Sequence, residues 1–217
     1  MNIFSFSKSD KISSATYIGV GNHKSILKDI VMECFDLFPT KIWIANCNLD
    51  TSSLSKEILE YEKKEESVKL SDIGGYQSHN FKSEAFLDAC FDNIPQLPEN
   101  PIEGFTVWSW VNVNRKGDYN SRHHHYNTDF FLSGVYYVSV PENSGVLRLW
   151  DPRGGLVSDS QDMLYFSNGH QYMDITPKEN MMIFFPSWLE HDVTANNSDK
   201  ERISIAFNIK QESLQLR

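Results

Sequence analysis

Apolar residues in the first part of the chain recur with the period of helices. Between Asn22 and Phe38 they return every three or four positions, which predicts an amphipathic helix with Asn22 as its N-cap. A second helix is predicted through LSKEILEYEKK, capped by residues 50–53, and a third over residues 83–94. The alternating segment KIWIANC, at 41–47, predicts a short strand between the first two helices.

Beyond the prolines at 96, 98 and 101 the pattern changes to that of strands. Short runs rich in β-branched and aromatic residues follow one another, with turn residues between them. They are FTVWSWVNVN, FLSGVYYVSV, GVLRLW, DMLYF, YMDI, MMIFFP and RISIAFNIK. So many short strands with no helix between them predict an antiparallel sandwich or barrel, with the helices packed against one outer face.

The chain is expected to be one domain, because 217 residues suffice for a single substantial core. The predicted fold class is mainly β with supporting helices (α+β), in which a mostly helical segment at 1–100 supports a β core at 101–217. Cys34, Cys47 and Cys90 are widely spaced in apolar contexts. We therefore expect reduced, structural thiols in place of disulfides or a zinc cluster.

Composition and charge limit the location and the partners. No apolar run approaches the roughly 20 residues of a membrane span. The polar N-terminus MNIFSFSKSDKISS lacks the apolar core of a signal peptide, so we expect a cytoplasmic protein that does not bind membranes. The net charge of -9 repels nucleic acid, which is not expected as a partner. The oligomeric state is left open, with a homodimer among the options.

The stretch RHHHYNTDF, at 122–130, places three of the chain's seven histidines in a row. If the segment is a strand, its alternation puts His123 and His125 on one face and His124 on the other. Two imidazoles on one face can bind one metal ion, and His191, which follows the apolar strand MMIFFP, is the candidate third ligand. Three neutral imidazoles suit iron, zinc, copper or nickel and leave positions open for a substrate. The alternative, that these are ordinary polar surface residues, stays open.

The last predicted strand, RISIAFNIK, carries Arg202 and Ser204 on one face and apolar residues on the other. An arginine that points inward requires an anion, and its guanidinium group matches a carboxylate in a bidentate way. The alternative for Arg202 is a surface ion pair at the rim.

Four residues of the strand WSWVNVN alternate onto one face and could line a pocket, although the tryptophans would serve equally well as core. They are Trp108, Trp110, Asn112 and Asn114. Tyr76 and Gln77, in the segment GGYQS, could reach the same site from the helical layer.

Together, several of these motifs resemble the 2-oxoglutarate/Fe(II)-dependent oxygenase family that is related to the prolyl-hydroxylase-like dioxygenases. The motifs are NVNRKGDYNSRHHHYNTDFFLSGVYYVSVP, GVLRLWDPRG, FFPSWLEHDV and RISIAFN, and the similarity extends upstream to residues 74–81 and 38–50. The resemblance implies a double-stranded β-helix, or jelly roll, that uses Fe(II), the cosubstrate 2-oxoglutarate and O2.

The same resemblance implies a ligand set for the metal. The family's pattern of Asn, two variable residues and His-x-His, laid on the sequence from Asn120, selects His123 and His125, and His191 matches the distal histidine. The wider superfamily has an acid two residues after its first histidine, where this chain has His125. Spacing and alternation favour three histidines as ligands, and the alternative is a carboxylate from Asp129, Asp151 or Asp192.

The resemblance also implies a site for the cosubstrate. Arg202 matches the basic residue that holds the distal carboxylate of 2-oxoglutarate, with Ser204 assisting it. Tyr137 is similar in position to a tyrosine that contacts the same carboxylate.

The implied activity is hydroxylation of an unidentified protein or small-molecule substrate, with decarboxylation of 2-oxoglutarate to succinate. Two other classes compete with this interpretation. One is a cupin-like metal-binding module with no oxygen chemistry, and the other is a three-histidine dioxygenase or isomerase that does not use 2-oxoglutarate. A purely structural protein would leave the histidines and Arg202 without a common explanation.

Overall fold

The computed structural model describes residues 39–68, 70–95, 104–125, 129–153 and 171–211. Residues 41–217 form a compact unit of their own. The helix predicted from Asn22, the prolines near residue 100 and the strand predicted at DMLYF lie outside the described residues. The prediction of a single domain over residues 1–217 therefore stays a prediction.

Two helices form where the apolar period predicted them. Helix α1 spans Thr51–Glu62, and the Asp50 carboxylate caps it by accepting from the Ser53 main-chain N–H at 3.1 Å. Helix α2 spans Glu84–Asn93 and buries Phe86 and Cys90, which lie one turn apart on the same face. Neither helix is long and apolar enough to cross a membrane.

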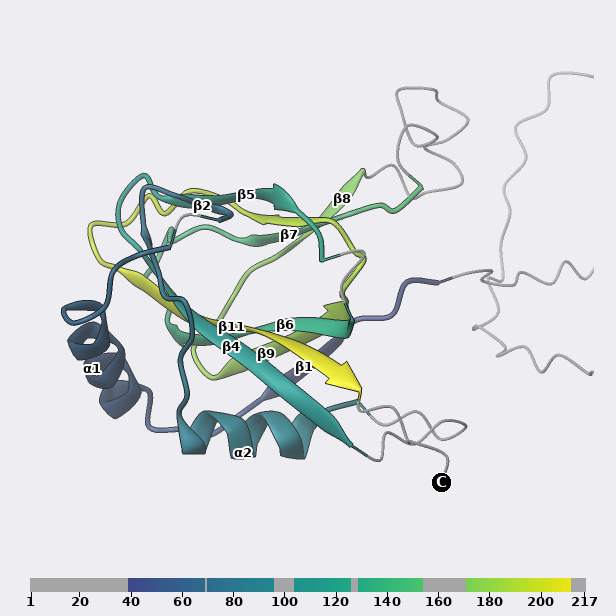
Figure 1. Ribbon diagram of the computed structural model, residues 1–217. Coiled ribbons are helices and arrows are strands. Elements are labelled where there is room, and N and C mark those ends of the chain that lie inside the picture. The colour runs from purple at the N-terminus through teal and green to yellow at the C-terminus, as the bar shows by residue number, and fades with distance from the viewer. Residues whose placement is uncertain (1–38, 69, 96–103, 126–128, 154–170, 212–217) are drawn as a thin grey trace, which may run out of the picture. The chain divides into compact units, whose positions relative to one another are not determined.

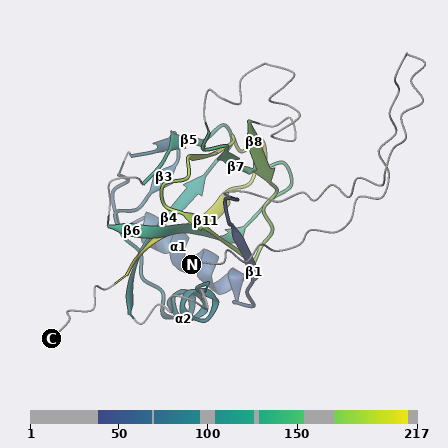
Figure 2. The ribbon, with the colours of Figure 1, turned by 90° about the vertical axis from the view of Figure 1, so that its right-hand side faces the viewer.

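The strands form two antiparallel sheets. The six-stranded sheet has the order β1 (Trp43–Asn46), β9 (Met181–Pro186), β6 (Phe130–Ser139), β11 (Arg202–Gln211), β4 (Phe105–Asn114) and β3 (Tyr76–Gln77). The five-stranded sheet has the order β2 (Asp72–Ile73), β5 (Tyr119–His123), β10 (His191–Val193), β7 (Leu147–Trp150) and β8 (Tyr172–Ile175). The smaller sheet faces the larger one, and the helices lie on the far side of the larger sheet (Figures 1 and 2).

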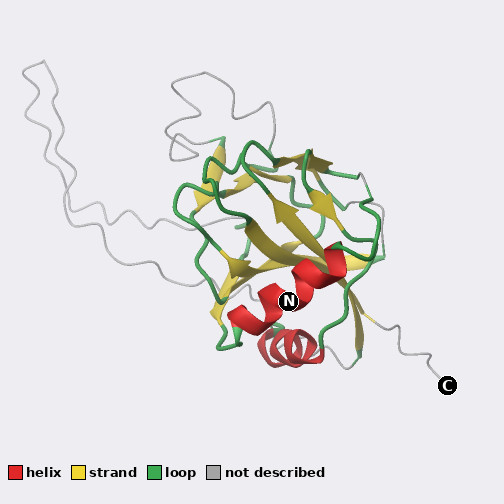
Figure 3. Ribbon diagram, turned by 90° about the vertical axis from the view of Figure 1, so that its left-hand side faces the viewer, coloured by secondary structure: helices red, strands yellow, loops and turns green. Residues whose placement is uncertain are grey.

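The larger sheet separates two apolar cores because its side chains alternate. Along β9, Met181, Ile183 and Phe185 pack between the two sheets, whereas Met182 and Phe184 pack toward the helices. Both helices lie together on one side of the strands (Figure 3). The predicted class, mainly β with helices on one outer face, is therefore confirmed. Of the described cysteines, Cys90 is buried, Cys47 is half-buried and both are free thiols.

Four short strands were not predicted as such. Strands β2, β3 and β10 have only two or three residues, and β5 is too polar to stand out as an apolar run. The assumption that RHHHYNTDF is one strand is wrong, because β5 ends at His123 and His124 and His125 lie beyond it. Strand alternation therefore does not place His125, and another contact must do so.

Gly134, in the middle of β6, sits where two chain segments approach closely. A Cβ atom there would lie 2.3 Å from the Phe207 Cζ atom and 2.5 Å from the Ile183 main-chain oxygen, which is fixed by β6–β9 pairing. We expect Gly134→Ala to lower the free energy of unfolding by about 1–3 kcal/mol through overpacking.

Urea denaturation would measure this change. Gly117→Asn is the matched control, because Gly117 has a positive φ of 89° that Asn tolerates, and no atom lies within 4 Å of the position that a Cβ would occupy there. An unchanged free energy of unfolding in Gly134→Ala would contradict the close approach.

Candidate metal centre

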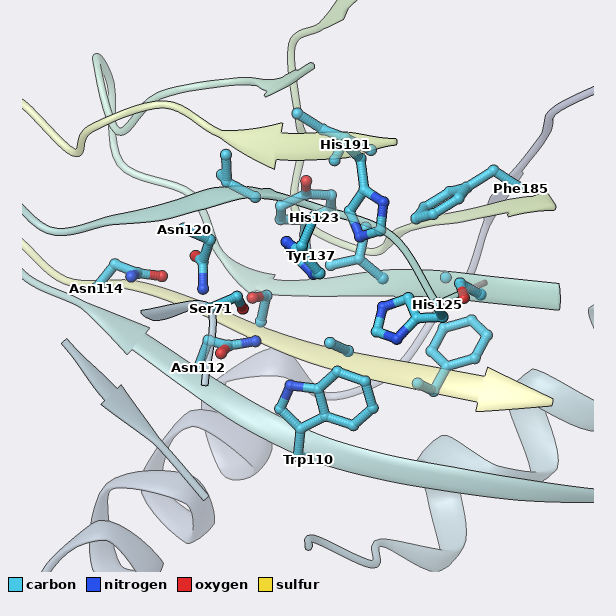
Figure 4. Close-up of a pocket in the computed structure, with 18 of the residues that line it drawn as sticks. Ser71, Trp110, Asn112, Asn114, Asn120, His123, His125, Tyr137, Phe185 and His191 are labelled. Carbon is cyan, nitrogen blue, oxygen red and sulfur yellow. The ribbon is translucent and has the colours of Figure 1, made fainter. Parts of the chain in front are cut away.

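Pairing of β5 with β10 brings two distant histidines together. His123, the last residue of β5, lies directly opposite His191, the first residue of β10, in an antiparallel register. Their ring centroids are 4.3 Å apart. Because the pairing fixes both backbones, the two imidazoles enter the space between the sheets from neighbouring strands (Figure 4).

His125 reaches the same point from the segment that follows β5. Its main-chain N–H donates to the Ser187 carbonyl oxygen at 2.8 Å, which ties this segment to the turn between β9 and β10. The His125 ring centroid lies 5.2 Å from that of His123 and 5.5 Å from that of His191. Each of the three residues offers a ring nitrogen, and these nitrogens all lie within 4.8 Å of one another. One metal ion fits such a group.

Main-chain carbonyls fix the protonation pattern of two rings. The Nδ1 atom of His123 lies 2.7 Å from the Ser121 carbonyl oxygen, and Nδ1 of His191 lies 2.8 Å from that of Leu189. Because a carbonyl oxygen only accepts, each Nδ1 carries the proton in the neutral ring. The Nε2 lone pairs of His123 and His191 are therefore available for a metal.

All three rings are held in the neutral form. Burial lowers the pKa of His123, lowers that of His125 to about 4 and lowers that of His191 well below its ordinary value. Repulsion by His123 lowers the pKa values of His125 and His191 further. Neutral imidazole is the form that ligates a metal, so this burial prepares the site for binding.

The structure gives each alternative carboxylate another partner. Asp129 is exposed and accepts from Lys210 Nζ at 2.6 Å, and Asp151 pairs with Arg153. Asp192 is next to His191, but its carboxylate accepts a hydrogen bond at 2.5 Å from Nε1 of Trp150, a residue of β7. Within the described residues, the three histidines are the one group with the proximity that a metal ion requires.

Arg202 lies in the same pocket as the histidines and is 1% exposed. Its Nη1 donates to the Ser144 and Thr194 carbonyl oxygens, the latter at 3.1 Å. Its Nη2 is buried and has no hydrogen-bond partner among the described residues, where no carboxylate lies within ion-pair distance either. A buried guanidinium group with an unused donor fits an anionic ligand that enters the pocket.

Tyr137 and Ser204 share the pocket with Arg202. They are register partners on β6 and β11, and both line the cavity. The Tyr137 hydroxyl is buried and unpartnered within the described structure, and burial raises its pKa to about 12, against the opposing effect of the Arg202 charge. The hydroxyl therefore stays protonated and, like Arg202 Nη2, is a donor that awaits an acceptor.

Gly145 makes room for the Arg202 guanidinium group. It lies in the turn before β7 with a φ of 90°, and a Cβ atom there would be 2.7 Å from Arg202 Nη1 and 2.3 Å from the Thr194 oxygen. The turn thus requires glycine both for its backbone conformation and for the close approach of Arg202.

Other predicted pocket residues divide between three places. Trp110, Asn112 and Asn114 line the pocket, as their alternation suggested (Figure 4). Trp108 does not, because it is 60% exposed and packs against Phe130. Tyr76 belongs to the core near the helices, and Gln77 lines an outer groove that opens beside the histidines.

Sequence reasoning missed several lining residues. Asn120 and Phe185 border the pocket, and the Phe185 ring centroid lies 4.7 Å from that of His191. Asn120 is the first residue of the family's histidine pattern, and this pattern could have indicated that Asn120 lies at the site. Ser71 gave no such signal, because it precedes a strand of two residues.

Comparison with known proteins agrees with this geometry. Residues 108–208 match the family model described as "Putative 2OG-Fe(II) oxygenase". No curated protein matches the sequence. A prolyl-4-hydroxylase from Pseudomonas putida is similar in structure, with a TM-score of 0.56 at 16% identity over 80% of this chain and 94% of that one.

Two further solved structures are similar over most of their length. The prolyl hydroxylase of Trichoplax adhaerens, in complex with a hypoxia inducible factor peptide fragment, has a TM-score of 0.56 at 18% identity, covering 78% of this chain and 83% of that one. HygX from Streptomyces hygroscopicus, with nickel and 2-oxoglutarate bound, has a TM-score of 0.53 at 10% identity, covering 79% and 83%. The predicted double-stranded β-helix is thereby confirmed.

Replacement of His191 should remove the metal. We expect the wild-type protein to bind one Co(II) or Ni(II) ion per chain, and His191→Ala to lose at least about 100-fold in affinity, since it removes a ligand. Isothermal titration calorimetry would measure both values.

The exposed residue His124, between the two other histidines, provides the matched control. We expect His124→Ala to bind the metal as the wild-type protein does. Retention of wild-type affinity in His191→Ala would remove His191 from the site.

Buried neutral histidines should make the metal-free protein sensitive to acid. A folded-state pKa below the unfolded value of 6.5 means that the unfolded chain binds more protons, so stability is full above pH 6.5 and decreases as the pH falls toward about 4. For each ring the loss is at most about 1.4 kcal/mol per pH unit, less for a partly exposed one.

Denaturation of chelator-treated protein between pH 7 and pH 4.5 would measure this loss. His125→Gln removes one of the three rings and should give a shallower decrease than the wild type. Equal slopes would show that His125 is not held neutral by burial.

Proposed function

We propose that this chain is an oxygenase whose Fe(II) is held by His123, His125 and His191. The proposal is supported by the match of residues 108–208 to the model of the 2-oxoglutarate/Fe(II) oxygenase family. The observation that carries the proposal is the pairing of two complementary features in one pocket. The three histidines and the unpartnered donors of Arg202 and Tyr137 line the same pocket, and Arg202 is bonded to the Thr194 carbonyl oxygen, three residues beyond His191 along the chain. A metal chelator with a distant carboxylate, such as 2-oxoglutarate, satisfies both.

Fe(II), 2-oxoglutarate and O2 together supply the oxidation, in which the cosubstrate loses CO2 to become succinate and a substrate C–H bond becomes C–OH. The chain's own residues bind and orient the reactants. Arg202 Nη2 and the Tyr137 hydroxyl donate to the C5 carboxylate of the cosubstrate, and Ser204, on the strand between β4 and β6, assists them. By holding the cosubstrate through its C5 carboxylate, these residues would leave its other carboxylate free for a metal ion at the histidines.

Three neutral ligands affect which cosubstrate binds. With a histidine in place of the usual carboxylate, the metal centre carries one more positive charge. Asp192, the acid nearest in sequence to His191, is hydrogen-bonded to Trp150 and does not offset this charge as a ligand. Together with the buried Arg202, the centre favours a dianionic cosubstrate.

The prime substrate would enter by the outer groove. The groove has a volume of about 420 Å³ and reaches the exposed side of His123 and His125, past Trp110 and Gln77. This volume is within the range of small-molecule sites and equally fits one side chain of a protein. We therefore propose an unidentified protein or small-molecule substrate, approached from this side.

Binding of 2-oxoglutarate should depend on Arg202. Under anaerobic conditions we expect the Fe(II)-loaded protein to develop a visible charge-transfer band on addition of 2-oxoglutarate. Arg202→Ala should weaken cosubstrate binding by roughly 30–1000-fold. This corresponds to roughly 2–4 kcal/mol, the combined effect of losing a buried charged hydrogen bond and leaving the carboxylate of the cosubstrate unpaired.

Because Arg202 also binds two main-chain carbonyls, its removal could unfold the protein, and Tyr137→Phe serves as the second variant. It keeps the ring and should weaken binding about tenfold. A wild-type protein that binds Fe(II) but develops no band would exclude the oxygenase proposal and leave a metal-binding module or a dioxygenase that does not use 2-oxoglutarate.

A further inference from the structure

The three imidazoles differ in the group that faces Nδ1. For His123 and His191 this group is a main-chain carbonyl oxygen, which can only accept a hydrogen bond. For His125 it is the side-chain amide of Asn208, whose Nδ2 lies 3.5 Å from Nδ1. The proton position on His125 is therefore set by a side chain that can rotate.

Ser133 holds the Asn208 amide in its present orientation. The Ser133 hydroxyl donates to Asn208 Oδ1 at 2.7 Å, and the two residues are register partners on β6 and β11. Both are buried, at 2% and 5% exposure. In this orientation the amide N–H faces His125 Nδ1 and can donate to it only when that nitrogen carries no proton, which favours the neutral ring protonated on Nε2.

A half-turn of the amide reverses every donor and acceptor in this chain of three groups. Asn208 Nδ2 would then donate to Ser133 Oγ, because a hydroxyl accepts as well as it donates. Asn208 Oδ1 would accept from His125 Nδ1, and the Nε2 lone pair of His125 would become available. At 3.5 Å the present contact between nitrogens is at the long limit of a hydrogen bond, so it opposes the rotation only weakly.

We propose that Asn208, backed by Ser133, is a positioning residue that rotates its amide when the metal binds and thereby selects the metal-binding tautomer of His125. The inference rests on the proposed metal centre. It makes His125 the adjustable ligand and His123 and His191 the fixed ones. His125 occupies the place where the wider superfamily has a carboxylate ligand. A carboxylate has no tautomers, so a residue that selects the tautomer is needed only when a histidine occupies this place.

Long-range ¹H–¹⁵N correlation spectra of ¹⁵N-histidine-labelled protein test the inference directly. In the metal-free protein we expect His123 and His191 with the proton on Nδ1 and His125 with the proton on Nε2. On addition of Zn(II), His125 should change to the Nδ1-protonated form. A metal-free His125 that already carries its proton on Nδ1 would overturn the inference.

Variants at Asn208 give a second readout, the Zn(II) affinity. In Asn208→Asp the carboxylate can only accept, so His125 should carry its proton on Nδ1 even without metal, and the affinity should rise about tenfold. In Asn208→Ala the affinity should fall about tenfold. Wild-type affinity in both variants would overturn the inference.

Asn112→Ala, which removes another buried amide from the same pocket, is the matched control and should leave the His125 tautomer unchanged. A wild-type protein that binds neither Zn(II) nor Fe(II) would refute the proposed metal centre, and with it this role of Asn208. A protein that binds metal with no effect of Asn208 would refute the inference alone.

Discussion

Strand β11 pairs along its whole length with β4 on one side and over residues 203–210 with β6 on the other, and the end of the pocket that holds Arg202 depends on this pairing. Its alternation sends Ile203, Ile205, Phe207 and Ile209 into the core beneath the helices. The opposite face gives Arg202, Ser204 and Asn208 to the pocket and the groove beside it. A shift of register by one residue would exchange these faces, placing Arg202 in the apolar core. The same packing that stabilises the sheet therefore fixes the position of Arg202, where the proposed cosubstrate would bind.

Charge explains why the pocket is incomplete without ligands. Arg202 is a buried cation that forms no direct ion pair within the described residues, although the charges of Asp72 and Asp118 act on it from further away, and such a group reduces stability unless a partner compensates it. The Tyr137 hydroxyl adds a buried donor without an acceptor. The histidines, in contrast, are neutral, so their burial costs less free energy than the burial of a charge. The proposed anionic cosubstrate would supply the missing acceptor for Arg202 and Tyr137, and the proposed metal ion would use the lone pairs of the histidines.

The sequence predicted the elements with strong periodicity and the residues that belong to motifs. Arg202 and Ser204 follow from the alternation of one long strand, and His191 from the apolar strand before it. His125 was placed beside His123 for the wrong reason, since the strand stops between them and a hydrogen bond to Ser187 positions it instead. A contact between residues so far apart in the chain leaves no trace in local periodicity. The same limit applies to Asn208, whose role depends on the distance of its amide from His125.

The two histidines of the smaller sheet are far apart in sequence, and their strands, β5 and β10, are short. A metal ion that binds both would act as a cross-link, closing the long loop between them and leaving the unfolded chain fewer conformations wherever the ion stays bound. Such a link would add to the few main-chain hydrogen bonds that hold these short strands together. The metal would then contribute to folding as well as to chemistry, so that iron supply in the cell would influence how much folded protein is present.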